Sequence, residues 1–266
     1  MTTITVHATA YQKTPWLVER TGDMPSDVTL VCFPHAGGSA AQFHAWQQIV
    51  GSSLHVVAAQ LPGRGGRFRE APIESLAVAA DAIASALCAR SMPRLALFGH
   101  SLGGLLAYEV ARRCVRRSMC RPEHLFVAGA TPPPCVRDAE RISHLPDADL
   151  LRAVMCMNGL PANLSSVERQ TVELMLPTLR ADLALEETYE YEPDDQFDVP
   201  ITSVAGSSDS VVPPQTMLRW GSVTRGTCRS VTFDGDHFFV DAKRDALIAL
   251  IRAELAPDRI GTGHAN

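Results

Sequence analysis

Short apolar runs recur along the chain, and between them lie longer stretches in which apolar residues return every three or four positions. The runs are Val28–Phe33, Leu54–Ala59, Leu95–Phe98, His124–Ala130, Ile201–Ala205 and Ser230–Phe233. Most of them are apolar at successive rather than alternate positions, which is typical of strands buried on both faces of a parallel sheet. Strands that alternate with helices predict βαβ units with right-handed crossovers. We therefore expect an α/β fold with a mostly parallel central sheet flanked by helices.

Helical periodicity follows several of these runs. Phe43 and Trp46 begin a short helix, and the stretch that starts at Ile73 places its apolar residues on one face. A last helix is expected over Ala242–Leu255. Ahead of the first run, Trp16–Val18 is the only segment expected to contact the core.

The stretch over residues 131–198 interrupts the alternation because it contains no good strand. Instead it shows apolar helical patterns over Asp147–Asn158, Val167–Pro177 and Leu179–Tyr191. The stretch leaves the carboxyl end of a strand, which is the face where open α/β sheets bind ligands. We therefore interpret it as an inserted helical lid over that face. An ordinary set of core-packing helices is the alternative.

Composition and charge narrow the class of protein. With 266 residues, of which 46% are hydrophobic, the chain suits one domain over residues 1–266. The formal net charge of −5 gives no reason to expect a nucleic-acid partner. Residues 1–7 lack the basic start and apolar core of a signal peptide, and no apolar run approaches the ~18 residues that span a bilayer. We expect a cytoplasmic protein with no membrane association.

The cysteine pattern does not suggest a disulfide framework. There are seven, an odd number without regular spacing, which argues against a set of disulfides. Cys114 and Cys120 form the only close pair, and the sequence shows no further ligands for a zinc site beside them. We therefore expect reduced thiols and no metal.

The strongest chemical signal is Gly99–Gly103, a Gly-x-Ser-x-Gly motif between an apolar run and a helical pattern. This strand–turn–helix context is that of a nucleophile elbow, in which the serine sits on a strained turn and its hydroxyl is exposed. Gly99 and Gly103 leave room where any Cβ would collide with the neighbouring strand or helix. Ser101 is therefore the expected nucleophile.

A serine hydroxyl needs a base, and the base needs an orienting carboxylate. Of the histidines after Ser101, His237 follows a strand at the carboxyl edge of the sheet and precedes the last helix. Asp209 lies in the loop after Ile201–Ala205, at the same edge, and is the expected acid. Asp234 and Asp236 are rivals, although a residue adjacent to His237 has trouble reaching its Nδ1. The other interpretation of Asp209 is an Asx-turn or a helix N-cap.

Two backbone amides are expected to form the oxyanion hole. One is that of Leu102, directly after the nucleophile, and the other comes from the Gly-Gly loop after the first run. Ala36 is the expected donor in that loop, with Gly37 as the next choice.

Together these motifs resemble the α/β-hydrolases. More narrowly, the chain resembles the type II (external, editing) thioesterases that accompany polyketide synthases and non-ribosomal peptide synthetases. The resemblance covers nearly the whole chain and is carried by Phe33–Gly38, Phe43, Trp46, Leu61–Arg64, Gly99–Gly104, Leu176–Asp182, Glu187–Tyr189 and Gly235–Phe239. Leu176–Asp182 and Gly235–Phe239 are far more diagnostic than the serine motif. Leu102 stands where many relatives carry methionine, which bears on the pocket lining but not on the backbone amide.

The resemblance implies an α/β-hydrolase fold and a serine thioesterase that acts in antibiotic biosynthesis. Its substrates would be aberrant or stalled acyl groups on the phosphopantetheine arm of acyl or peptidyl carrier proteins. The reaction would use a Ser-Asp-His triad and no cofactor.

Carrier proteins of this kind are typically acidic, and a lid accommodates an acyl chain. The residues expected to contact carrier or substrate are Arg64, Arg67, Met155, Met175 and Leu183, with Arg69 beside the first two. The arginines lie on a loop that leaves the carboxyl end of a strand, and the apolar residues lie in the lid. A richer basic cluster over Arg112–Arg121 is interpreted instead as a solvated helix face.

Other functions share these residues. A carboxylesterase or lipase-like hydrolase would use the same triad and differ in its leaving group. An excised terminal thioesterase that cyclises its product is a second alternative. A non-catalytic protein that binds carrier proteins is the third, although a complete Ser-Asp-His set argues against it.

Overall fold

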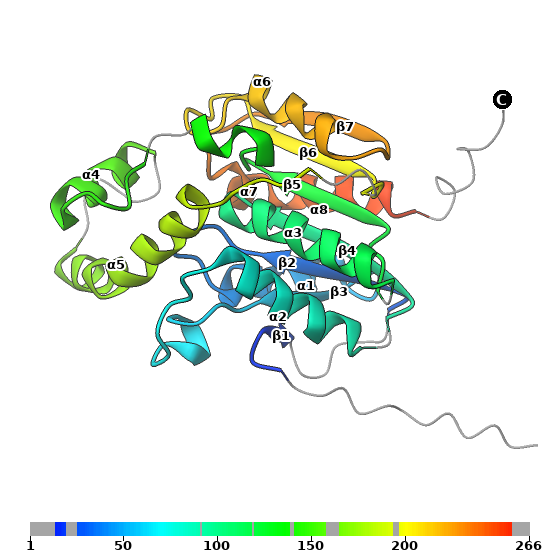
Figure 1. Cartoon of the computed structure of the whole chain (residues 1–266), viewed down its shortest axis with the longest axis horizontal. Helices are drawn as coiled ribbons and strands as arrows, with labels where there is room; N and C mark the ends of the chain where they lie inside the picture. The colour runs from blue at the N-terminus through cyan, green and yellow to red at the C-terminus, as the bar shows by residue number, and fades with distance from the viewer. Residues whose placement is uncertain are drawn as a thin grey trace, which may run out of the picture.

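The computed structural model describes residues 14–19, 26–90, 92–118, 120–138, 141–157, 165–193 and 197–256. Within these residues, seven strands form one sheet in the order β1-β3-β2-β4-β5-β6-β7 (Figure 1). The strands are β1 (Leu17–Glu19), β2 (Val28–Phe33), β3 (His55–Ala59), β4 (Arg94–His100), β5 (His124–Ala128), β6 (Ile201–Gly206) and β7 (Cys228–Phe233). Every neighbouring pair is parallel except β1 with β3, which confirms the expected mostly parallel sheet.

Helices cover both faces of the sheet. The α-helices are α1 (His44–Val50), α2 (Leu76–Cys88), α3 (Leu102–Arg117), α4 (Asp147–Cys156), α5 (Ser166–Glu187), α6 (Pro214–Met217), α7 (Phe239–Ala242) and α8 (Arg244–Glu254). Short 3-10 helices cover Ala40–Phe43, Gly65–Arg67, Pro133–Asp138 and Leu218–Val223. Ser75 is the N-cap of α2, and its side chain accepts a hydrogen bond from the amide of Val78.

Successive residues of β2 point into two separate cores. Leu30 and Cys32 pack in one core with α1 and α8. Val31 and Phe33 pack in the other core with α2 and α3. All four side chains are fully buried, and Figure 1 shows the sheet between the two helical layers. This is why β2 reads as a continuous apolar run and not as an alternating one.

The connection from β5 to β6 contains α4 and α5 and, in its described residues, no strand. Figure 1 shows these two helices together at one end of the sheet, outside the two helical layers. They share a small apolar core of their own that includes Ile142, Leu150 and Leu176. Within residues 131–198, α4 and α5 thus share a core of their own, but Leu185 of α5 packs in the main core with α2 and α3.

Three elements differ from the sequence-based expectations. Pro177 lies inside α5, which is one helix and not two. The buried residues on either side of it, Leu176 and Thr178, hold the helix in place by tertiary packing. The last helix, expected over Ala242–Leu255, is confirmed as α8, but the short helix α7 before it was not expected. Residues around Trp16 form β1, which is too short to show a pattern and depends on β3 as a distant partner.

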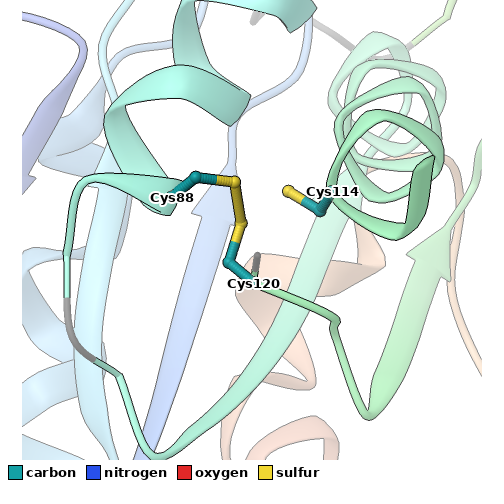
Figure 2. Close-up of side chains that lie close together, drawn as sticks. All are labelled: Cys88, Cys114 and Cys120. Carbon is teal, nitrogen blue, oxygen red and sulfur yellow. A yellow bond between two sulfur atoms is a disulfide. The ribbon is translucent and has the colours of Figure 1, made fainter. Parts of the chain in front are cut away.

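The expectation of fully reduced thiols is wrong. Cys88, at the end of α2, and Cys120, in the loop between α3 and β5, form a disulfide across 32 residues of sequence (Figure 2). The packing of α2 against α3 brings them together, and sequence spacing does not reveal that contact. Cys114 of α3 lies beside them, and the three sulfur atoms are all within 4.8 Å of one another.

In the described part of the chain, no helix is long and apolar enough to cross a lipid bilayer.

Candidate active site

Ser101 occupies a sharp turn between β4 and α3. Its φ is positive, at 55° with ψ −126°, a backbone conformation that is rare outside glycine. A Cβ added to Gly99 would lie 2.1 Å from the carbonyl oxygen of Gly103, and one added to Gly103 would lie 2.2 Å from that of Phe33. Both glycines are therefore required for the strand and helix to meet this closely, and the turn presents the Ser101 hydroxyl at the sheet edge.

Three side chains form a continuous hydrogen-bonded chain at this edge. Nε2 of His237 lies 3.1 Å from Oγ of Ser101, and Nδ1 of His237 lies 2.9 Å from Oδ2 of Asp209. A carboxylate can only accept, so Nδ1 carries a proton and Nε2 is left to accept from the serine hydroxyl. His237 and Asp209 are 5% and 4% exposed, so their mutual hydrogen bond is shielded from solvent, whereas Ser101 is partly exposed to the cavity.

Asp209 is held by its own loop. Its second oxygen, Oδ1, accepts hydrogen bonds of 2.9 Å from the amides of Val211 and Val212. Both interpretations of this residue therefore describe its geometry, because it forms an Asx-type turn and also faces His237. The rival Asp236 instead accepts a hydrogen bond from the amide of Phe238, 2.9 Å away.

Two further histidines surround the site, and the sequence analysis missed both. His100 is fully buried next to Ser101, and its Nε2 donates to the carbonyl oxygen of His237 over 2.9 Å. His35 donates through Nδ1 to the carbonyl oxygen of Ala36, also over 2.9 Å. Burial lowers the pKa of both rings, most strongly that of His100, so both are neutral. The sequence signal that could have identified them is their position: His35 precedes the Gly37–Gly38 pair, and His100 lies inside the Gly99–Gly103 motif.

The expected oxyanion loop lies beside the nucleophile. Ala36 lines the same cavity as Ser101 and His237. The amide of Gly37 is already used, because it donates a 2.7 Å hydrogen bond to Oδ2 of Asp182. Of the two residues considered in this loop, Ala36 is thus the better candidate for an oxyanion donor.

An apolar cavity opens above Ser101 between the sheet edge and the inserted helices. The residues that α4, α5 and the segment after α4 contribute to its wall include Val154, Met157, Leu179, Leu183, Glu186 and Glu187. Leu183 was expected there. Met155 and Met175 do not line the cavity, because the helical periodicity of α4 and α5 turns them to other faces.

Glu186 is an ionisable residue in the wall of this cavity, and the sequence analysis did not single it out. Burial raises the pKa of its carboxyl group, against smaller opposing effects of His237 and of a hydrogen bond with Thr131. Glu187 and Arg141 also line the cavity, so its mostly apolar wall carries several polar positions, with Glu186 the one whose carboxyl group His237 affects.

The expectation that Arg64 contacts a carrier protein is wrong. Its side chain is 1% exposed and forms a buried ion pair with Asp182 of α5. Its guanidinium also donates to the carbonyl oxygens of Pro62 and Gly38, at 3.1 and 3.3 Å. A surface role was inferred from its loop position, but the loop folds inward under α5.

Arg67 is also largely engaged within the protein. It forms hydrogen bonds of 2.9 and 2.6 Å with the carboxylate of Glu70 and one of 3.1 Å with the carbonyl of Gln60. Its guanidinium stacks 4.3 Å from the ring centre of Trp16. Phe68 and Arg69, next to it, are exposed.

The basic cluster on α3 is neutralised locally. Arg112 and Arg113 both pair with Glu109, and Arg113 and Arg117 both pair with Asp81. The interpretation as a solvated helix face fits the exposed Arg116 and Arg117 but is wrong for Arg112, which is 4% exposed and buried against Glu109.

Comparison with known proteins finds a family model and several homologous sequences that match most of the chain. Residues 28–255 match the thioesterase domain family. Over 92% of this chain and 97% of the relative, it is 31% identical to the gramicidin S biosynthesis protein GrsT of Aneurinibacillus migulanus.

Solved structures agree with this match. One is the thioesterase RedJ from the prodiginine pathway of Streptomyces coelicolor, with TM-score 0.81, 36% identity and coverage of 89% of this chain and 90% of that one. Another is the type II thioesterase BorB from the borrelidin cluster, with TM-score 0.83, 32% identity and coverage of 91% and 98%. The chain is therefore a member of the thioesterase family with the α/β-hydrolase fold, and thus a thioester hydrolase.

Proposed function

We propose that the chain removes acyl groups from the phosphopantetheine arm of acyl or peptidyl carrier proteins in polyketide or non-ribosomal peptide biosynthesis. Ser101 is the nucleophile, His237 the general base and Asp209 the residue that orients His237. The hydrogen-bonded chain from Ser101 through His237 to Asp209, at the base of an apolar cavity, is the observation that carries this proposal.

The first half-reaction forms an acyl-enzyme. His237 takes the proton of the Ser101 hydroxyl through Nε2 while the serine oxygen attacks the thioester carbonyl. The amides of Ala36 and Leu102 stabilise the oxyanion that forms. When the tetrahedral intermediate collapses, the carbon–sulfur bond breaks and the pantetheine thiol leaves with the proton held by His237.

The second half-reaction returns the enzyme. Water replaces the thiol, gives a proton to His237 and attacks the acyl-serine carbonyl. The carboxylic acid leaves as Ser101 regains its proton. Asp209 keeps the same tautomer of His237 in both halves and stabilises the imidazolium that forms in each.

The inserted helices act as a lid over the acyl chain. Apolar side chains from α4 and α5 line the cavity above Ser101, which supports this role. A carrier protein docks at the rim of the cavity. Because Arg64 is buried, the exposed residues Phe68 and Arg69 take its place as candidate contacts for the carrier protein. Rim charges of this kind mainly change the association rate and its salt dependence.

The test compares acyl-loaded carrier protein with the matched free acyl thioester and a simple ester, for wild type, Ser101→Ala and the exposed-serine control Ser222→Ala. We expect faster release from the carrier than from the free thioester, abolished only in Ser101→Ala. Equal or better turnover of the simple ester would indicate a general esterase. Hydrolysis that survives in Ser101→Ala would overturn the triad, and carrier binding without any hydrolysis would indicate a scaffold.

A further inference from the structure

One turn of α5 contacts two loops that surround the nucleophile. Asp182, on this turn, is fully buried, and both of its carboxylate oxygens are occupied. Oδ1 accepts from Nη2 of Arg64 over 2.6 Å, and Oδ2 accepts from the amide of Gly37 over 2.7 Å and from Nη1 of Arg64. One carboxylate thus joins the inserted helix to the oxyanion loop and to the loop after β3.

Neighbouring residues of the same helical turn strengthen this connection. The hydroxyl of Thr178 donates to the carbonyl oxygen of Gly63 over 2.9 Å. Leu179 packs on Gly37: a Cβ added to Gly37 would lie 3.2 Å from Cδ1 of Leu179. The segment from Thr178 to Asp182 is therefore the part of α5 that is docked on both loops.

The peptide group between Ala36 and Gly37 is held at both ends. His35 donates to the Ala36 carbonyl oxygen over 2.9 Å, and the Gly37 amide donates to Asp182. The Ala36 N–H belongs to the preceding peptide, whose His35 carbonyl oxygen accepts a hydrogen bond of 2.9 Å from the amide of Gly38. Holding the Ala36–Gly37 peptide constrains the ψ torsion of Ala36, which joins the two planes, and so limits how far the Ala36 N–H can turn. That N–H is the oxyanion donor in the proposed function, on which this inference rests.

We propose that Asp182 is a positioning residue that couples the inserted helices to the oxyanion hole. When α5 is docked, Asp182 holds the Ala36–Gly37 peptide in place and thereby keeps the adjoining peptide, which carries the Ala36 amide, directed at the developing oxyanion. When Asp182 is lost or withdrawn, the peptide can rotate and the donor is misaligned. The helices then do more than cover the acyl chain, because they complete the catalytic geometry.

The test uses Asp182→Ala, which removes both contacts, and Asp182→Asn, which keeps an acceptor for Gly37 but not the charge that faces Arg64. Glu123→Gln is the matched control. Glu123 lies outside the site and accepts two hydrogen bonds from the guanidinium of Arg94, of 2.9 and 2.8 Å. For each variant, kcat and KM are measured with a short acyl thioester. Two affinities are measured in parallel: one for a trifluoromethyl ketone that forms a tetrahedral adduct with Ser101, and one for a non-reacting planar acyl amide.

Loss of one oxyanion donor lowers kcat by roughly 10²–10³-fold. We expect Asp182→Ala to approach that loss, with a matching loss of ketone affinity and an amide affinity within about twofold of wild type. Asp182→Asn should recover part of both, and the control should change neither. If Asp182→Ala and Asp182→Asn lower the melting temperature but leave kcat and ketone affinity as in wild type, Asp182 is only structural and the inference is wrong. Failure of the proposed function is a different result, because wild type itself would then not release acyl groups.

A second, independent observation concerns three cysteines outside this site, at the end of α2, on α3 and in the loop after α3. Cys88 and Cys120 are half-buried and joined by a disulfide, and buried Cys114 points toward them from α3 (Figure 2). Around a zinc ion with Zn–S bonds of about 2.3 Å, three thiolate sulfurs would lie roughly 4 Å apart. All three sulfur atoms lie within 4.8 Å of one another.

The geometry points to a site for one soft cation in the reduced protein. A dithiol reductant gives two electrons and two protons to the Cys88–Cys120 bond and is itself oxidised to a disulfide. The three thiols then release three protons as they bind one Zn²⁺, and a water can fill the fourth position from the half-buried side. The disulfide is the metal-free, oxidised state of the same site.

Co²⁺ serves as the spectroscopic probe of this site. Reduced wild type and the Cys228→Ala control, whose cysteine is exposed on β7, should bind one Co²⁺ per chain with thiolate charge-transfer absorption. Cys114→Ala and the unreduced protein should lose at least tenfold in affinity. An absence of binding by reduced wild type, or unchanged binding by Cys114→Ala, would contradict the site.

Discussion

His100 and His237 are joined by a hydrogen bond of 2.9 Å from Nε2 of the first to the backbone carbonyl of the second. Burial, together with the nearby rings of His35 and His237, lowers the pKa of His100 well below its usual value. The ring is therefore neutral, and because a carbonyl only accepts, its proton is on Nε2. The residue just before Ser101 thus holds the turn that carries the base.

Replacing His100 with leucine should misplace His237. The buried carbonyl of His237 would lose its donor, which costs about 1–3 kcal/mol of stability. A shift of the base lowers catalysis by about tenfold or more, and KM should stay within about twofold. Steady-state kinetics and urea denaturation test this, with the exposed His44→Leu as control. An unchanged kcat would show that the hydrogen bond does not position the base.

Gly103→Ala should prevent correct folding of the elbow. Its Cβ would lie 2.2 Å from the Phe33 carbonyl oxygen, so β2 or α3 would have to move. We expect a loss of more than about 3 kcal/mol in the free energy of unfolding, or no folded protein. Gly66→Ala is the matched control, because nothing lies within 4 Å of its added Cβ. Comparable stability of the two variants in urea would contradict the steric account.

His124 should make the protein less stable in acid. Its ring is stacked on Phe126, and burial lowers its pKa from 6.5 to about 4. Between these values the unfolded chain binds a proton that the folded chain does not, so stability falls as pH drops from about 6.5 to 4.

One such proton corresponds to about 1.4 kcal/mol per pH unit. The free energy of unfolding of His124→Gln should decline less steeply than that of wild type across this window, by up to that slope. His35 and His100 act in the same direction and are present in both proteins, so the difference isolates His124. Parallel curves would show that His124 titrates normally in the fold.

Leu183 should help to set the length of the acyl chain. It lines the cavity above Ser101, so Leu183→Ala lengthens the available space. A contact of about one methylene group changes discrimination roughly 10-fold or more. We expect kcat/KM to shift by about that factor toward longer acyl thioesters. Met175→Ala, on the same helix but outside the cavity wall, should leave the preference unchanged, and an equal shift in both variants would argue against a direct contact.

Local pattern was sufficient for most of the fold. The apolar runs of β2 and β4 predicted a parallel sheet because strands buried on both faces have few polar positions. The flanking glycines of Ser101 predicted the sharp turn because steric exclusion acts over a few residues. His237 and Asp209 were predicted as partners because the carboxyl ends of parallel strands meet at one edge, and the structure brings both side chains to Ser101. Their catalytic roles stay predictions.

What the sequence could not determine depends on contacts between distant segments. The sequence by itself determined the order of strands and helices, the nucleophile elbow and the family motifs, because these follow from local sterics and periodicity. Only the tertiary structure decided that Arg64 is buried against Asp182 and not exposed on a loop, since side-chain burial depends on what packs above it. The same holds for Cys88 and Cys120, because the end of α2 and the loop after α3 meet only once α2 packs on α3.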